Sequence, residues 1–144
     1  MKLFTLTAFL FCSFYSPIFS QTSGTLQIEA RSFRNAKGFM RIAVYNNKTH
    51  FLETNGYFSV GQATINGDKA STSMSLPVGT YAVSFLHDEN NDSKMEYTLG
   101  VPREGFGISN LKSFPFGKPT YEKSLVTIEA GKTTYVPMKV FYFF

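Results

Sequence analysis

The chain has 144 residues, of which 43% are hydrophobic and 17% are charged, and its formal net charge at pH 7 is +4. This length is enough for one domain with a single hydrophobic core, and the composition is ordinary for a globular protein. The basic residues are scattered along the chain rather than clustered, which argues against a nucleic-acid partner.

The first twenty residues have the pattern of a secretory signal peptide, because Lys2 precedes a mainly apolar run and the small residue Ser20 ends the segment. The apolar run is shorter than the ~20 residues that a membrane-spanning helix needs. The only cysteine, Cys12, lies inside this run, so the mature chain has no disulfide. We therefore expect a signal peptide at residues 1–20 that is removed, a domain at residues 21–144 that does not span a membrane, and a secreted or periplasmic bacterial protein.

Alternation of apolar and polar residues dominates the rest of the sequence, and helical periodicity is nearly absent. The segments that we predict as strands are, in chain order, 25–32, 38–45, 57–65, 70–76, 80–87, 123–129 and 133–143. One short helical turn is expected at 51–56. The Asn66-Gly67-Asp68 turn predicts a hairpin between the third and fourth strands, and the turn at 130–132 predicts another between the last two.

About seven short strands separated by turns predict an all-β fold, a single antiparallel two-sheet sandwich of the immunoglobulin-like or prealbumin-like type. A small closed barrel is the structural alternative. The aromatic residues at 141–144 also resemble the end of an outer-membrane barrel, but segments 71–75 and 84–87 are too short or too polar for lipid-facing strands.

The sequence Leu-Pro-Val-Gly-Thr-Tyr at 76–81 resembles the Leu-Pro-x-Gly-x-Tyr turn of prealbumin-like and carboxypeptidase-regulatory-like domains, in which the tyrosine packs inward. Segments 81–90 and 99–110 together are more specific, and they resemble the bacterial exported proteins of domain-of-unknown-function family 2141. That family typically has glycines in the acidic loop, where this chain has Asn91 and Ser93. The resemblance covers nearly the whole mature chain and implies an exported β-sandwich with no known reaction.

An acidic loop follows the predicted strand 80–87, with oxygen-bearing side chains at alternate positions. The candidate metal ligands are Asp88, Asn90, Asp92 and Glu96, together with the carbonyl of Lys94. This spacing is typical of calcium loops, because alternate residues of a curling backbone point toward one centre. Ser93 and Leu99 replace the glycine and the bidentate glutamate of an EF-hand, which leaves a looser Asp-x-Asn-x-Asp site with calcium as its cofactor. The alternative is that the side chains bind backbone amides and shape the loop.

The long irregular segment 88–121 predicts a binding surface, since loops of this length inside a compact domain are uncommon and often functional. Its candidate residues are His87, Glu89, Arg103, Glu104, Phe106, Ser109 and Asn110. Two structural roles are the alternative: Arg103 could neutralise the acidic loop, and Phe106 and Ile108 could close one end of the sandwich.

These patterns favour a non-enzymatic binding or accessory module whose partner is an unidentified protein, peptide or glycan. The first alternative is a small periplasmic hydrolase that uses His87 with Asp88 or Glu89 as a general base. The second is a structural or adhesion module that associates through an edge strand.

Overall fold

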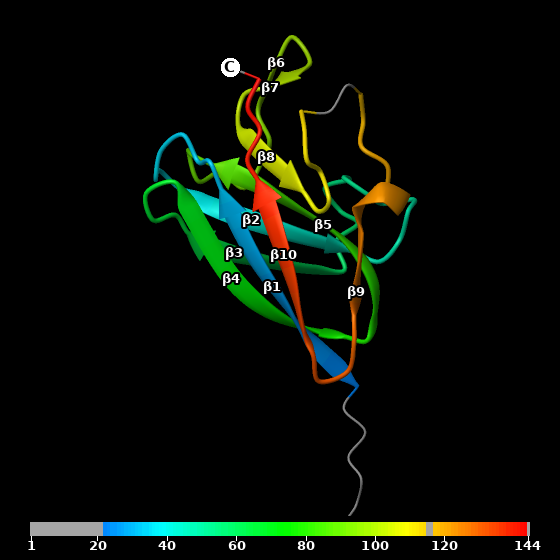
Figure 1. Cartoon of the computed structure of the whole chain (residues 1–144). Coiled ribbons are helices and arrows are strands. Elements are labelled where there is room, and N and C mark those ends of the chain that lie inside the picture. The colour runs from blue at the N-terminus through cyan, green and yellow to red at the C-terminus, as the bar shows by residue number, and fades with distance from the viewer. Residues whose placement is uncertain (1–21, 115–116, 144) are drawn as a thin grey trace, which may run out of the picture.

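The computed structural model describes residues 22–114 and 117–143, so the predicted signal peptide lies outside the described residues. Two β-sheets pack face to face (Figure 1). One sheet has the strand order β10-β1-β4, formed by Thr133–Lys139, Ser23–Arg31 and Lys69–Pro77. The other has the order β3-β2-β5-β8, formed by Ser59–Thr64, Phe39–Tyr45, Gly79–Asp88 and Gly105–Ile108, and β9 (Leu125–Ile128) also pairs with β5. The predicted all-β sandwich is therefore confirmed.

Each predicted strand segment contains a strand, and the segment 88–121 contains three more. These are β6 (Tyr97–Thr98) and β7 (Val101–Pro102), which pair with each other, and β8. A short 3-10 helix, η1 (Glu122–Ser124), precedes β9. The sheets are not wholly antiparallel, because β1 pairs with β10 in parallel. Residues 51–56 form turns rather than the expected helical turn.

The two predicted hairpins are wrong in their strand pairing. The turn at Asn66–Lys69 forms, with a bridge between those residues, but β3 then pairs with β2 whereas β4 pairs with β1 in the other sheet. The strands β9 and β10 likewise do not pair with each other, because β9 pairs with β5 and β10 pairs with β1. A turn sequence determines where the chain reverses. The pairing partner depends on burial: β1 and β2 carry regular apolar faces that must meet across the core, and their neighbours follow them into separate sheets.

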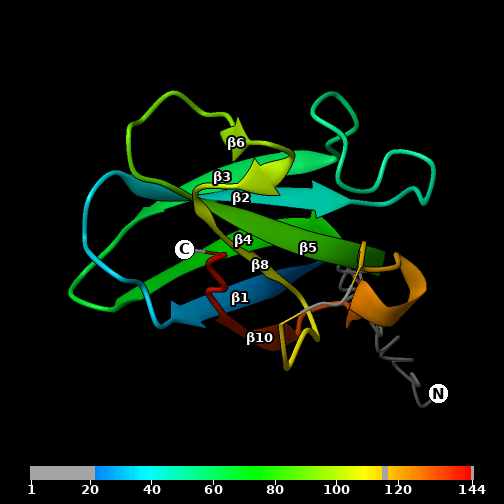
Figure 2. The same cartoon turned by 90° about the horizontal axis from the view of Figure 1, so that it is seen from above.

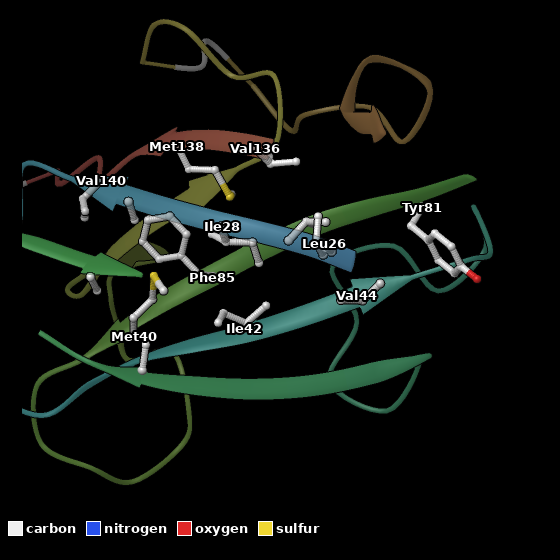
Figure 3. Close-up of a cluster of buried hydrophobic side chains, with 14 of the residues drawn as sticks. Leu26, Ile28, Met40, Ile42, Val44, Tyr81, Phe85, Val136, Met138 and Val140 are labelled. Carbon is white, nitrogen blue, oxygen red and sulfur yellow. The ribbon is translucent and has the colours of Figure 1, made fainter. Parts of the chain in front are cut away.

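The core lies between the inward faces of the two sheets (Figure 3). Leu26 and Ile28 of β1 are fully buried, and they face Met40 and Val44 of β2, which are also fully buried. Tyr81 of β5 packs inward, as the family resemblance implied, and its hydroxyl donates to the carbonyl of Pro77 at 3.0 Å. This bond fixes the sharp turn by which the chain passes from one sheet to the other.

A second apolar cluster lies on the outer face of the five-stranded sheet. Its fully or nearly buried members are Tyr45, Phe51, Ala82 and Ile108. The rings of Tyr45 and Phe51 meet edge to face with centroids 5.4 Å apart, and Phe51 contacts Tyr121 in the same manner. Loops therefore cover part of this face, and β6 lies on the side of the five-stranded sheet away from β1 and β10 (Figure 2).

Candidate binding groove

The outer face of the five-stranded sheet is lined at its centre by small side chains. Ala43 of β2 lies opposite Ser84 of β5 in the register, and the next pair along the strands on the same face is Arg41 with Leu86. Phe106 of β8 continues the row beside Leu86. Large residues at the ends and small residues in the middle leave a hollow above the sheet.

Three surface segments surround this hollow. Together with the sheet they form a groove of about 1320 Å³, which we call the outer groove. Leu52 and Tyr57 come from the loop before β3, and Pro119 comes from the segment before η1. Met95 precedes β6, and Tyr97 is the first residue of β6. The large apolar side chains of the groove that stay exposed are Tyr57, Val60, Tyr97 and Phe143. Exposed apolar surface gathered in one concavity is typical of a binding site rather than of ordinary protein surface.

The described lining of the outer groove carries positive charge only. Arg41, Lys94 and Lys118 line it, and no aspartate or glutamate is found among the described lining residues. Each nitrogen of the Arg41 guanidinium donates a hydrogen bond: to Asp88 Oδ2 at 2.6 Å, to Gln62 Oε1 at 2.9 Å, and to Asn91.

The acidic loop is held together by its own backbone amides. Asp88, which is fully buried, accepts the N–H of Asp92 at 3.1 Å on Oδ1 and the N–H of Ser93 at 3.0 Å on Oδ2. Asn90 Oδ1 accepts the same Asp92 N–H at 3.1 Å, and Asp92 Oδ1 accepts the N–H of Lys94 at 2.8 Å. Glu96 accepts from the Asn90 side-chain amide. These are the loop-shaping bonds that formed the alternative to a metal site.

Among residues 22–114 and 117–143, no group of three His, Cys, Asp or Glu side chains is arranged to hold a metal ion. The positive charge beside Asp88 is supplied by the Arg41 guanidinium instead. Calcium binding by Asp88, Asn90, Asp92, Lys94 and Glu96 therefore stays a prediction.

A smaller polar pocket of about 430 Å³ brings together several residues of the predicted binding surface. Its lining residues are Arg34, Glu89, Asn90, Glu96, Thr98, Arg103 and Glu104. Arg34 donates to Glu89 at 2.7 Å, and Asn35 donates to the other oxygen at 2.8 Å. Burial raises the pKa of Glu89, but these two hydrogen bonds and the positive charge of Arg34 together leave the pKa lowered. Burial raises the pKa of Glu104, which accepts the N–H of Glu89 at 3.0 Å.

His87 lines neither the outer groove nor the polar pocket, because it points into the core and is fully buried. Its Nε2 lies 3.0 Å from the carbonyl oxygen of Lys37, which can only accept, so this nitrogen carries the proton. Nδ1 then accepts from the hydroxyl of Tyr142 at 2.7 Å. Burial lowers the pKa of His87, which favours the neutral ring.

The remaining residues of the predicted surface divide between structural contacts and the groove. The buried hydroxyl of Ser109 accepts the N–H of Val83 at 3.0 Å and donates to the carbonyl of Ser124, which ties β5 to the chain before β9. The side-chain amide of Asn110 donates to the carbonyl of Leu125 at 2.9 Å. Phe106, by contrast, lines the outer groove, and so does Lys94, one of the metal ligands predicted from the sequence.

Sequence reasoning missed most of the groove, although a signal for it was present. Segments 38–45 and 80–87 are apolar on both faces, since Ala43 and Tyr45 alternate with the core residues of β2, and Ala82 and Leu86 with those of β5. Strands that are apolar on both faces are covered on both faces.

The fold and the groove define a β-sandwich domain with one sheet face hollowed and partly covered by loops. The model of a bacterial family described as "Uncharacterized protein conserved in bacteria (DUF2141)" matches residues 28–136, and the chain belongs to this family. No curated protein and no solved structure matches the chain. Within the described part of the chain, no helix combines the length and apolarity needed to cross a membrane.

Proposed function

We propose that this protein is a non-enzymatic binding module that holds a single-chain amphiphile in the outer groove. The observation that carries the proposal is the groove itself. It has a volume of about 1320 Å³ and a mainly apolar lining, and it lies over the small residues Ala43 and Ser84. The proposed location is the bacterial periplasm or the cell exterior, which the composition of the first twenty residues supports.

A hydrocarbon chain suits this groove better than a peptide does. The groove lies on a sheet face, where the backbone N–H and C=O groups of β2 and β5 are paired within the sheet. A peptide buried there would leave its own backbone groups without partners, at a cost of about 1–3 kcal/mol each. A hydrocarbon chain has no such groups and gains from the removal of apolar surface from water.

The binding proposal is preferred to the hydrolase alternative because of the surroundings of His87. Both ring nitrogens are engaged, by Lys37 and Tyr142, and the side chain is fully buried. A general base must reach the proton that it abstracts. The outer groove offers an accessible concave surface, which a binding module requires and a buried histidine does not supply.

The test is isothermal titration of the delipidated protein with dodecanoate, dodecyl maltoside and dodecyltrimethylammonium, each below its critical micelle concentration. We expect saturable binding of at least one of these at one molecule per chain. Ala43→Trp, which fills the floor of the groove, should weaken that binding by at least tenfold while the protein stays folded. Ser73→Trp is the matched control, because Ser73 is exposed on β4 of the other sheet.

Two results would overturn the proposal. One is the absence of saturable binding for all three amphiphiles. The other is equal binding by the Ala43→Trp and Ser73→Trp proteins, which would place the ligand outside the groove.

A further inference from the structure

The outer groove has a charge asymmetry that its apolar lining does not explain. Its described lining includes Arg41, Lys94 and Lys118 but no carboxylate, in a chain that has 14 basic and 10 acidic residues. A groove that served only hydrocarbon would gain nothing from cations at its wall. Charge of one sign in a concave, partly apolar setting attracts ligands of the opposite sign.

The three cations are not equivalent. Arg41 is neutralised by the buried carboxylate of Asp88 and is held further by Gln62 and Asn91. Neither Lys94 nor Lys118 forms an ion pair with another described residue. The charge left for a ligand is therefore that of the two lysines.

The acidic loop places Lys94 at the groove. Asp88 accepts the N–H of Ser93 at 3.0 Å, and Asp92 accepts the N–H of Lys94 itself at 2.8 Å. Asp88 is at the same time anchored to Arg41 on the groove floor. The backbone that carries Lys94 is thus tied to the sheet through Asp88 and Arg41.

We propose that the ligand of the outer groove is a free long-chain carboxylic acid whose head group pairs with the ammonium of Lys94, with Lys118 as the second cation of the site. This inference rests on the proposed function and adds the head-group chemistry. A lysine suits this role, because its aliphatic stem can lie against hydrocarbon while its ammonium meets the carboxylate. The acidic loop then acts as the support for a cationic side chain.

The test compares amphiphiles and variants by isothermal titration at low ionic strength. We expect dodecanoate to bind at least tenfold more tightly than dodecyl maltoside, and dodecyltrimethylammonium to bind most weakly. Lys94→Met keeps an apolar stem and removes the charge, so it should weaken dodecanoate binding by roughly tenfold and weaken dodecyl maltoside binding much less. Lys69→Met is the control, since Lys69 is exposed on β4 of the other sheet.

The outcomes separate this inference from the proposed function. Equal dodecanoate binding by Lys94→Met and the unmodified protein would overturn the head-group assignment, and the groove would stand if Ala43→Trp still blocked binding. Failure of all three amphiphiles would overturn both. The protein could instead float with anionic phosphatidylglycerol vesicles and fail to bind monomeric dodecanoate. That result would identify a bilayer surface as the partner and would reject the free acid as the ligand.

Discussion

Arg41 and Asp88 form the ion pair that joins the outer groove to the acidic loop. The guanidinium Nε lies 2.6 Å from Asp88 Oδ2, and the Asp88 side chain is fully buried whereas that of Arg41 is 28% exposed. The two residues come from neighbouring strands, β2 and β5, and the same carboxylate also accepts two loop amides. One buried aspartate therefore orients both the arginine of the groove floor and the backbone of the loop.

Removal of the arginine charge should destabilise the protein strongly. Arg41→Met leaves the buried carboxylate of Asp88 without its counter-ion, and an uncompensated buried charge costs about 3–5 kcal/mol. Urea unfolding followed by circular dichroism measures the change. Arg31→Met breaks the exposed pair of Arg31 with Glu29 and should cost much less than the Arg41 variant, because solvent screens exposed pairs. Equal losses for the two variants would mean that the Asp88 pair has no special role.

His87 should make the protein less stable in mild acid. Burial lowers its pKa from the ordinary value of 6.5, so below pH 6.5 the unfolded chain binds a proton that the folded chain does not. Stability from this group is complete above pH 6.5 and falls as the pH is lowered toward the pKa of the folded state.

The check is the difference between the unmodified protein and His87→Gln, measured by urea unfolding from pH 7.5 to pH 5.5. Glutamine can still donate to Lys37 and accept from Tyr142, but it does not titrate. The variant should lose less stability over this interval than the unmodified protein. The comparison also removes the contribution of Glu104, whose pKa is raised by burial and whose effect has the opposite sign. Parallel curves would show that His87 does not titrate in this window.

Calcium should leave the melting temperature unchanged. Asp88 already accepts hydrogen bonds from Arg41 and from two backbone amides, and Asp92 accepts one from the amide of Lys94. The loop is therefore organised by donors of the protein itself. Differential scanning calorimetry of metal-stripped protein with and without millimolar calcium gives the answer. A rise of several degrees that disappears in Asp92→Asn would instead support the calcium site predicted from the sequence.

Local patterns predicted the sandwich well because alternation is a property of each strand by itself. Leu26, Ile28 and Ala30 point inward as their spacing requires. Strand partners were not predictable in this way: Asn66-Gly67-Asp68 specifies a reversal, whereas the separation of β3 and β4 into two sheets depends on contacts far apart in the sequence. The groove was missed for the same reason, since its floor and its walls come from segments that meet only in the folded chain.

The backbone conformation of the acidic loop was harder to predict from the sequence, above all at the two positions where the family resemblance expects glycine. Asn91 has φ of 63° and Ser93 has φ of 64°, both in the left-handed region that glycine adopts without cost. The sequence marks these positions only through the comparison with the family pattern. Asparagine tolerates this conformation, but serine is strained there by about 1 kcal/mol.

Ser93→Gly should therefore stabilise the protein slightly. Relief of the left-handed strain at φ of 64° exceeds the extra backbone entropy that glycine gives the unfolded chain, for a net gain of about 0.5 kcal/mol. The matched control is Ser71→Gly in β4, where the backbone is extended and the same exchange should cost about 0.5–1 kcal/mol. Urea unfolding of the two variants should shift the midpoints in opposite directions. Two midpoints that both fall would show that the Ser93 side chain contributes more to the loop than its backbone strain costs.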